Sequence, residues 1–306
     1  MIIGKEGFLM KTIIKGKEYF YTNEVRKNPS IRHSFNELAK KIYGIDFECW
    51  CQNGFWEDNY IPYVLIDEDK VVSNVSVNII HTNYRNEEKL FIQLGTVMTD
   101  ECYRKQGLSQ WLIEKILDEW KGQCDALYLF ANDTVLDFYP KFGFVKKQEY
   151  QAIGTVVSRE AEIRILDMDS DSNRKLLYEK YALSNQFSDL TMDSNRGLLM
   201  FYCSQFMKEN IYYIAKYDLV VVAEYDTNKL ICYDIFGRSN VTLQEILSVM
   251  AKEDTKVCML GFTPKDKANF SFDKVNAEGT TLFWYSEKEN IFSCYVKLMF
   301  PLLSHA

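Results

Sequence analysis

The order of strand-like and helix-like segments between residues 63 and 150 constrains the fold of this chain most. Apolar residues that alternate or run without a break predict strands, and apolar residues that recur every three or four positions predict helices. The segments are strands at 63–66, 71–80 and 91–98, a helix at 107–120, a strand at 126–130, a helix at 134–142 and a strand at 144–150.

Two further helices are predicted before the first of these strands. Ser30 can cap a helix at 30–43 that Gly44 ends, and Asp46 can cap a shorter helix at 46–51. Helices that precede and interrupt a run of strands favour a mixed β-sheet with helices on its faces. The sequence therefore predicts an α+β fold for the first half of the chain.

The second half of the chain repeats this order of elements. The segments are a strand at 161–166, helices at 171–183 and 195–207, strands at 211–215, 219–225 and 230–236, a helix at 242–250, and strands at 257–261, 281–285 and 295–299. Recurrence of one order predicts a degenerate internal duplication, with an unrelated α+β domain as the alternative. We expect two tandem domains, at 1–158 and 159–306.

The composition excludes several classes of protein. The 306 residues carry a formal net charge of −7, so the chain lacks the basic excess that binding to duplex nucleic acid requires. No segment approaches the ~18 consecutive apolar residues of a membrane helix, and the first residues do not form a signal peptide. Among eight cysteines, Cys49 and Cys51 are a close pair with no second pair to complete a zinc site. We therefore expect a cytoplasmic protein that binds neither membrane nor nucleic acid.

A polar loop joins the strand at 91–98 to the helix at 107–120. It contains Arg104, Lys105 and Gly107 immediately before the helix. The first amides of a helix have no partner within the helix, and the helix dipole favours negative charge there. Glycine lets a phosphate approach the main chain, and cations add charge-assisted contacts. The loop predicts an anion site, and a solvated strand–helix connection is the alternative.

A second motif follows the strand at 126–130. Asn132 is followed seven residues later by Tyr139 and then by a Gly-Phe pair at 143–144. Together with Arg104-x-x-Gly107-x-Ser109, this block resembles the GNAT superfamily of acyl-CoA-dependent N-acyltransferases in its motifs, their order and the surrounding elements. The resemblance covers about residues 20–150 as a GNAT-like domain.

The resemblance implies an acetyl-CoA site and a catalytic tyrosine. Tyr139 matches the family's usual general acid, which protonates the CoA thiolate as the thioester breaks; the alternative is a packing aromatic. Main-chain amides at the end of the third strand and in the following loop would cradle the pyrophosphate, and Asn132 would contact the pantetheine arm. The resemblance implies no metal site. It implies that these residues bind the cosubstrate: Val97, Met98, Thr99, Arg104, Lys105, Gln106, Gly107, Leu108, Ser109 and Asn132.

Two residues depart from the family pattern. Ser109 replaces a glycine or alanine, and Gln93 stands where many relatives carry a glutamate base. An amide cannot accept a proton, so water, another residue or an amine that arrives neutral must serve. Nearby candidates for a base are Asp100, Glu101 and His81, of which His81 is predicted to lie in a loop.

The expected function is an N-acetyltransferase that moves an acetyl group from acetyl-CoA to an amine. The acceptor partner is a small molecule or a peptide, and a homodimer is compatible with the sequence. The second half lacks both motifs, so we expect it to be a degenerate GNAT-like domain without a CoA site. A non-catalytic acyl-CoA-binding or sensor protein is the main alternative, because Gln93 removes the usual base. A protein-interaction module of two GNAT-like shells, which would bind no CoA, is a third hypothesis.

Overall fold

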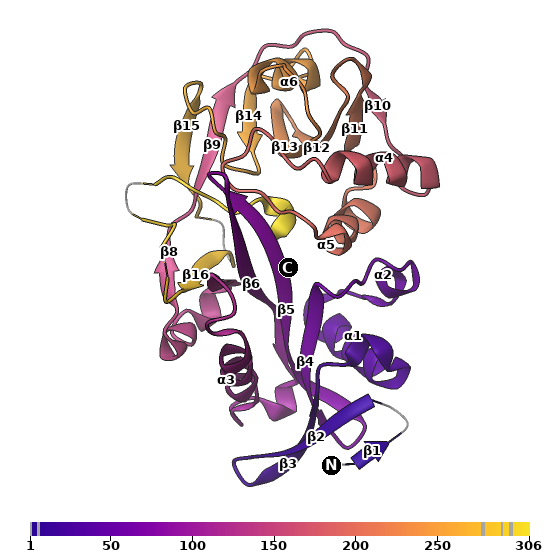
Figure 1. Ribbon diagram of the computed structural model, residues 1–306, viewed down its shortest axis with the longest axis vertical. Coiled ribbons are helices and arrows are strands. Elements are labelled where there is room, and N and C mark those ends of the chain that lie inside the picture. The colour runs from indigo at the N-terminus through magenta and orange to yellow at the C-terminus, as the bar shows by residue number, and fades with distance from the viewer. Residues whose placement is uncertain (1, 5–6, 277–278, 289, 294–295) are drawn as a thin grey trace.

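The strands of the protein form two β-sheets (Figure 1). The computed structural model describes residues 2–4, 7–276, 279–288, 290–293 and 296–306. Over these ranges the first sheet has nine strands in the order β1-β2-β3-β4-β5-β6-β7-β16-β8, and the second has seven in the order β10-β11-β12-β13-β14-β9-β15. Helices flank both sheets, which confirms the predicted α+β class and agrees with two tandem GNAT-like units.

The first sheet contains the segment that carries both motifs. Most of its neighbouring strands are antiparallel, but β6 and β7 are parallel, so the sheet is mixed. Its strands are β1 (Ile2–Gly4), β2 (Gly7–Ile14), β3 (Lys17–Thr22), β4 (Tyr60–Asp67), β5 (Lys70–Tyr84), β6 (Glu87–Thr99), β7 (Ala126–Ala131), β16 (Thr281–Tyr285) and β8 (Val145–Lys147).

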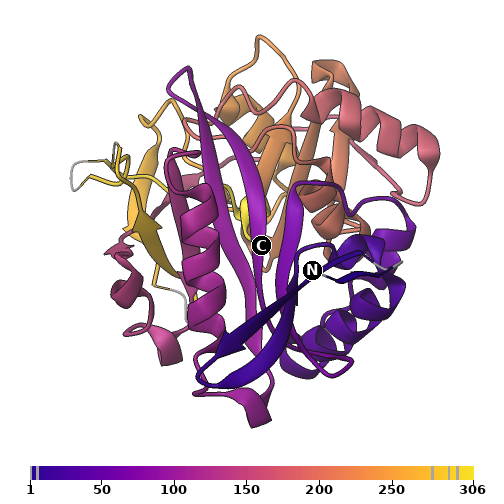
Figure 2. The same ribbon diagram turned by 60° about the horizontal axis from the view of Figure 1, so that its bottom comes forward.

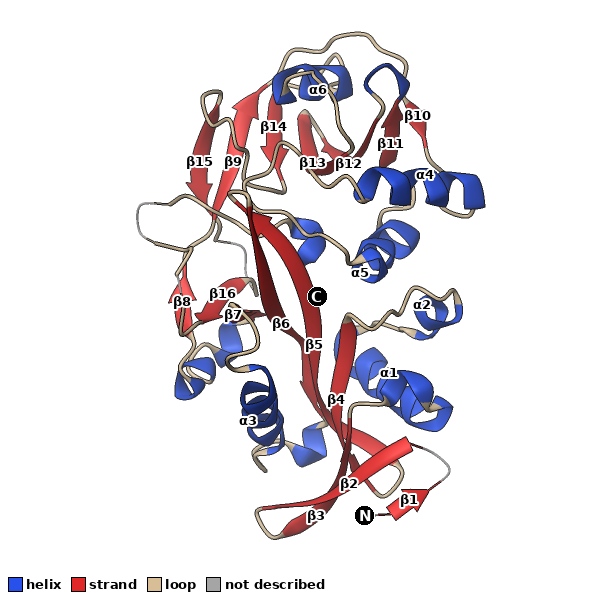
Figure 3. Ribbon diagram, viewed as in Figure 1, coloured by secondary structure: helices blue, strands red, loops and turns tan. Residues whose placement is uncertain are grey.

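Helices cover both faces of the first sheet (Figure 3). The amphipathic helix α3 (Leu108–Trp120) packs its buried Leu112 and Ile116 on one face. On the other face lie α1 (Pro29–Tyr43) and α2 (Glu48–Gln52), with Phe35 and Trp50 in a shared aromatic core. None of the helices among the described residues is long and apolar enough to cross a membrane.

The cap of α1 differs from the prediction. The side chain of Asn28 accepts hydrogen bonds from the amides of Ser30 (3.1 Å) and Ile31 (3.2 Å), so Asn28 is the cap and Ser30 lies inside the first turn. Pro29 fits the first helical position, where no amide donor is needed. Gly44 ends the helix in the left-handed region, as predicted.

The second sheet has its own helices, α4 (Asp171–Tyr181), α5 (Arg196–Phe201) and α6 (Leu243–Met250). Here too one pair of neighbouring strands, β13 and β14, is parallel. The strands are β10 (Arg164–Ile165), β11 (Ile211–Ile214), β12 (Leu219–Asp226), β13 (Lys229–Phe236), β14 (Val257–Leu260), β9 (Tyr150–Thr155) and β15 (Phe270–Lys274).

The two sheets exchange strands, so a single division at residue 158 does not separate them. β9 precedes that division but lies in the second sheet, between β14 and β15. β16 lies in the first sheet, between β7 and β8, where Phe283 pairs with Leu129 on one side and with Lys146 on the other. The predicted boundary of 1–158 and 159–306 is therefore wrong for these two strands, because long-range pairing outweighs chain continuity.

One apolar core joins the two sheets. Ile80 and Phe91 of the first sheet share a buried cluster with Val220 and Phe236 of the second. Phe300 completes it and stacks on Tyr128 with ring centroids 4.0 Å apart. The last residues therefore run between the sheets, and the chain ends against the middle of the first sheet, as the turned view also shows (Figure 2).

Several predicted elements are shorter or broken. The helix expected at 134–142 is two 3-10 turns, at Asp133–Val135 and Tyr139–Phe142, because Pro140 has no amide proton for a continuous helix. The strand expected at 144–150 divides into β8 and the start of β9. The helix expected at 195–207 becomes a wide π-type turn after α5. Of the strand expected at 295–299, residues 296–299 are not in a strand and residue 295 lies outside the described residues.

Candidate functional site

The parallel strands β6 and β7 separate after four paired positions. They pair from Phe91 with Ala126 to Leu94 with Leu129, and Gly95 and Phe130 no longer pair. We call the opening between residues 95–99 and 130–132 the fork. Because β6 and β7 do not pair with each other there, main-chain N–H and C=O groups of the fork can bind an extended ligand that carries amide groups.

A bulge in β6 shapes one side of the fork. The register with β5 shifts between Asn74 and Ser76, and Thr96 has a φ of 47°. Bulges redirect the main chain and are frequent beside active sites. The carbonyl oxygen of the next residue, Val97, accepts a hydrogen bond of 2.6 Å from the hydroxyl of Tyr43. The bulge was not predictable from sequence, because the residues that form it have no distinctive pattern.

The loop after β6 leaves the start of α3 open. Lys105 and Gly107 have φ values of 64° and 86°, and Gly107 occupies the N-cap position without any side-chain hydrogen bond to the helix amides. Left-handed residues in such loops help to build anion-binding concavities from main-chain N–H groups. No side chain among the described residues caps the first amides of α3, so these amides can receive an anionic ligand.

The other predicted loop residues lie around this opening with different exposures. Arg104 is exposed, with its guanidinium 3.9 Å from the carboxylate of Glu101. The side chains of Met98 and Leu108 are buried in the cores on opposite faces of the sheet, so only their main-chain groups can face a ligand. The side chain of Gln106 accepts a 2.9 Å hydrogen bond from the hydroxyl of Tyr19.

Ser109 has a structural explanation for its departure from the family pattern. Its hydroxyl lies 2.7 Å from the hydroxyl of Thr99, which also lies 2.9 Å from the hydroxyl of Ser73. This chain of hydrogen bonds ties the end of β6 to the first turn of α3. The extra hydroxyl is satisfied within the protein, so it fixes the loop to the sheet.

Tyr139 lies in an aromatic cluster on the α3 face of the sheet. It is 4% exposed, and its ring contacts those of Phe144 and Phe283, with centroids 6.3 Å and 5.7 Å away. Burial raises the pKa of its phenol, and the neighbouring phenol of Tyr43 raises it further. The hydroxyl of Tyr43 also donates to the Val97 carbonyl, so Tyr139 lies near the bulged strand. Its raised pKa means that the phenol of Tyr139 is protonated at neutral pH.

Asn132 stands where β7 ends and the first 3-10 turn begins. Its side-chain oxygen accepts a 2.9 Å hydrogen bond from the amide of Thr134, which makes it the cap of that turn. The residue is exposed, so its amide nitrogen faces solvent at the edge of the fork. Asn132 thus has a local structural role at the place where the motif predicts a ligand contact.

Gln93 and the three candidate bases occupy different surroundings. Gln93 is fully buried and accepts a 3.4 Å hydrogen bond from Asn78, while its Nε2 has no partner among the described residues. Asp100 binds Lys41 at 2.8 Å, and this contact lowers the pKa of its carboxyl. Glu101 is exposed beside Arg104. His81 lies in β5, not in the predicted loop, and its side chain is exposed.

The end of the chain reaches the fork from the face opposite α3. The ring of His305 stacks on Phe130 with centroids 3.8 Å apart, and the hydroxyl of Tyr202 donates to the His305 carbonyl at 2.5 Å. The main-chain oxygen of Ala306 lies 2.4 Å from where a Cβ on Gly95 would be. These contacts were not predictable from sequence, because they join residues 103 or more positions apart.

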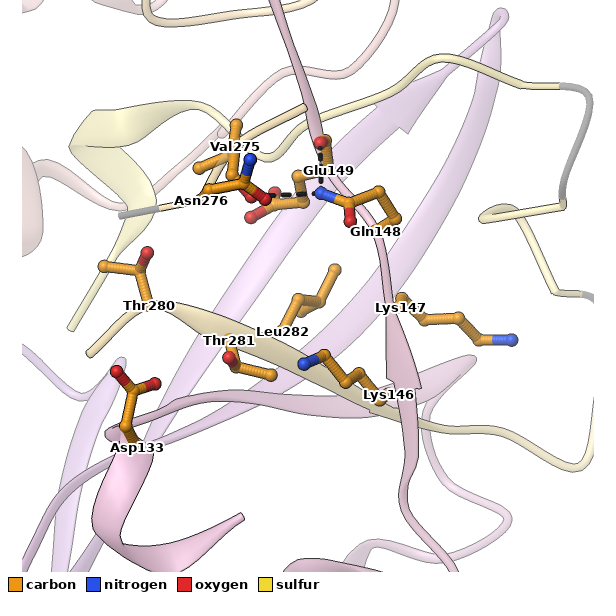
Figure 4. Close-up of a pocket in the computed structure, with 10 residues that line it drawn as sticks. All are labelled: Asp133, Lys146, Lys147, Gln148, Glu149, Val275, Asn276, Thr280, Thr281 and Leu282. Atoms are coloured by element: carbon orange, nitrogen blue, oxygen red, sulfur yellow. Dashed lines mark hydrogen bonds between the residues drawn. The ribbon is translucent and has the colours of Figure 1, made fainter. Parts of the chain in front are cut away.

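A cavity of about 200 Å³ lies beside β8 and β16 (Figure 4). The described residues that line it are Asp133, Lys146, Lys147, Gln148, Glu149, Val275, Asn276, Thr280, Thr281 and Leu282. Burial raises the pKa of Glu149 to about 8, and its Oε1 accepts a 2.8 Å hydrogen bond from the amide of Phe300. Glu149 is therefore a buried neutral carboxyl at the crossing between the sheets.

A known domain family matches the part of the chain that contains this loop. The sequence profile of the acetyltransferase (GNAT) domain matches residues 58–146, which include the 104–109 loop and both strands of the fork. A protein of Melanoplus sanguinipes entomopoxvirus, provisionally named a glycylpeptide N-tetradecanoyltransferase, is 27% identical over 96 residues. That match spans 31% of this chain and about a third (32%) of the viral protein.

Solved structures show that the two-sheet fold is shared. A probable N-acyltransferase from Enterococcus faecalis superposes with a TM-score of 0.61 at 14% identity, covering 85% of this chain and 71% of its own. A GCN5-related N-acetyltransferase from Anabaena variabilis gives a TM-score of 0.56 at 12% identity, covering 87% and 72%. Both likenesses extend well beyond the matched domain and include the second sheet. Residues 58–146 therefore form a GNAT acetyltransferase domain, and the chain as a whole shares its fold with these acyltransferases.

Proposed function

We propose that the chain transfers an acetyl group from acetyl-CoA directly to an amine of a small molecule or peptide. The observation that carries this proposal is the fork of the first sheet beside the uncapped start of α3. The fork offers main-chain groups to an extended amide-containing ligand, and the helix start offers free amides to a phosphate. CoA combines these two chemical features in one molecule.

The proposed donor site follows from this match. The pyrophosphate would bind the main-chain amides of residues 104–109, with Arg104 and Lys105 adding positive charge. The pantetheine arm would lie along the fork, between Val97 on one strand and Asn132 on the other. Tyr139 would then lie on the same face of the sheet as the thioester.

The chemistry requires one bond to form and one to break. The amine nitrogen attacks the thioester carbonyl, a C–N bond forms, and the C–S bond breaks to release the CoA thiolate. Tyr139 donates its proton to that thiolate and regains one from solvent, while the nitrogen loses its own proton. A phenol whose pKa is raised by burial is protonated in the resting enzyme, and a thiolate that forms in the same apolar surroundings has its basicity raised as well.

The acceptor amine is proposed to react in its neutral form. It would approach from the face of the fork that His305 and Ala306 line, where Gln93 cannot accept a proton. Burial lowers the pKa of His305 to about 3, so this imidazole does not titrate near neutrality. The rate should therefore rise with pH and level off at the pKa of the acceptor. If the pH–rate profile levels off at the same pH for acceptors of different basicity, the group that titrates is instead a base on the enzyme.

A binding measurement and a turnover measurement test the proposal separately. At a hundredfold excess over its dissociation constant, acetyl-CoA should stabilise the fold by about 2.7 kcal/mol. No thermal shift at millimolar concentration would exclude CoA binding and favour the interaction module. Release of free thiol over a panel of amines then separates an enzyme from an acyl-CoA sensor, which would bind without turnover. Because the viral relative is named for a tetradecanoyl group, tetradecanoyl-CoA is tested as a second acyl donor, which we expect to react more slowly than acetyl-CoA.

A further inference from the structure

The N-terminal hairpin brings a lysine to the loop that we propose for the pyrophosphate. Lys15 lies at the tip between β2 and β3. A Cβ built on Gly107 would lie 3.2 Å from the Cε of Lys15 and 3.6 Å from its Nζ. The ammonium group therefore lies directly beside the residue that opens α3. The matched domain begins at residue 58, so the family profile assigns no role to this hairpin.

Side-chain contacts hold the hairpin against the loop. The hydroxyl of Tyr19 donates to Gln106 at 2.9 Å. Lys17 and the hydroxyl of Tyr103 both donate to the same oxygen of Asp67, at 2.5 Å and 2.7 Å. These contacts join β3 of the hairpin to the loop, directly through Tyr19 and by way of Asp67 of β4, so they hold the hairpin tip beside Gly107.

Two acidic groups beside the loop are paired with lysines. Asp67 pairs with Lys17, and Asp100 pairs with Lys41, and each contact lowers the pKa of the carboxyl. Among the described residues, no ion pair involves Lys15 or Lys105. The loop thus has an excess of positive charge at the free amides of α3, which favours a multiply charged anion.

The backbone at Lys15 is unfavourable for a lysine. Lys15 and Gly16 have φ values of 48° and 83°, and they form the two-residue turn of the hairpin. Asparagine and glycine suit the first position of such a turn, whereas a lysine there is strained. A contribution to hairpin stability therefore does not explain this residue, and its side chain must be considered for another role.

We propose that Lys15 binds the pyrophosphate of CoA, so that the N-terminal hairpin forms part of the donor site. This inference rests on the proposed acetyl-CoA function. The ammonium adds a charge-assisted contact to those of Arg104 and Lys105, and the uncapped amides of α3 supply the remaining donors. We assign the pyrophosphate, not the 3′-phosphate, because Nζ lies at Gly107, where the helix amides begin.

The substitution Lys15→Asn tests this role without endangering the fold. Asparagine is preferred at this turn position, so the variant should melt no lower than the wild type. Its dissociation constant should rise about tenfold for CoA and equally for dephospho-CoA, which keeps the pyrophosphate but lacks the 3′-phosphate. Lys15→Arg keeps the charge and should bind within about threefold of the wild type. Lys11→Ala on the same hairpin removes an exposed lysine paired with Glu18 and should leave CoA binding unchanged.

The outcomes separate this inference from the proposed function. If the wild type binds no CoA, the proposed function is wrong, and the inference that Lys15 binds CoA is wrong with it. If the wild type binds CoA and Lys15→Asn binds it equally well, the inference about Lys15 is wrong while the function stands. A loss for CoA alone, with dephospho-CoA unaffected, would contradict the pyrophosphate assignment and place the contact at the 3′-phosphate.

Discussion

The two sheets contain the same local arrangement, but only the first leaves its helix open. β6, α3 and β7 correspond in order to β13, α6 and β14, and each set ends in a parallel pair of strands. α3 begins at Gly107 with no side-chain cap. α6 begins at Thr242, whose side chain accepts from the amide of Glu245 (3.2 Å), while the Glu245 carboxylate accepts from the amide of Thr242 (3.0 Å).

The parallel strand pairs differ in the same way: β6 and β7 separate to form the fork, whereas β13 and β14 remain joined. β13 and β14 pair up to Cys232 and Leu260, and the next amide, of Gly261, donates to the Cys232 carbonyl at 2.7 Å. The amide of Leu302 donates to Gly261 at 2.8 Å. Main-chain bonds within the chain thus occupy the position that corresponds to the fork. The same topology can therefore bind or exclude an anionic ligand, depending on the residues at the start of the helix.

The largest expected effect concerns Tyr139, which should matter for turnover only. Tyr139→Phe should lower kcat by a factor on the order of 10²–10⁴ with little change in CoA affinity, because the hydroxyl acts only as the C–S bond breaks. The matched control is Tyr225→Phe in the second sheet, whose hydroxyl donates to the Met250 carbonyl at 2.6 Å. Equal rates for Tyr139→Phe and the wild type would make Tyr139 a packing aromatic, and parallel losses of rate and affinity would make it a binding contact.

Gly107→Glu should abolish CoA binding by giving α3 an acidic start like that of α6. The carboxylate would repel phosphate at the free amides, and we expect affinity to fall by at least about a hundredfold. The left-handed backbone adds a strain of about 1–2 kcal/mol. Gly44→Glu has a similar φ of 70° with no atom within 4 Å, so it controls for strain away from the loop. Unchanged affinity in a folded Gly107→Glu variant would mean that the loop is misidentified.

Much of the first domain was predictable from sequence because its signals are local. The strands from 63 to 98, the helix α3 and the free loop at Gly107 follow from periodicity and from one glycine. Lys15, Ala306 and the exchanged strand β16 reach the same region through contacts across the whole chain, which no local pattern contains. The bulge at Thr96 also lacked a signal, because pairing with β5 imposes it.

Glu149 should make the joint between the two sheets sensitive to pH. Its pKa is raised to about 8 in the folded state from a usual value near 4.5. Its stabilising contribution is therefore complete below pH 4.5 and is lost as the pH rises towards 8. Glu149→Gln stays neutral and should lose less stability between pH 5 and pH 8, by an amount on the order of a few kcal/mol.

Asp234 controls for this effect within the second sheet. Burial raises its pKa to about 7, against the lowering effect of the hydrogen bond from Asn185. The contribution of Asp234 therefore changes with pH in the same direction and remains in the Glu149→Gln variant. Thermal melts at several pH values measure the difference. Identical pH dependence in the wild type and in Glu149→Gln would show that Glu149 is not a buried neutral carboxyl.

The smallest expected effect lies at the closed helix of the second sheet. Glu245→Gln removes the negative charge from the capping box of α6 and should lower the stability of the fold only slightly. It should not create a CoA site, because the adjoining strand pair is closed by main-chain bonds. A chemical-denaturation series gives the stability change. A second CoA site in this variant would show that the cap alone separates the two sheets.

The stoichiometry of CoA binding tests the central claim most directly. Calorimetric titration of the full chain with acetyl-CoA should give one site per chain, and the same titration of Gly107→Glu should give none. Two sites in the wild type would contradict the closed state of the second sheet. A single site that survives Gly107→Glu would place the ligand elsewhere and contradict the assignment of the fork and the 104–109 loop.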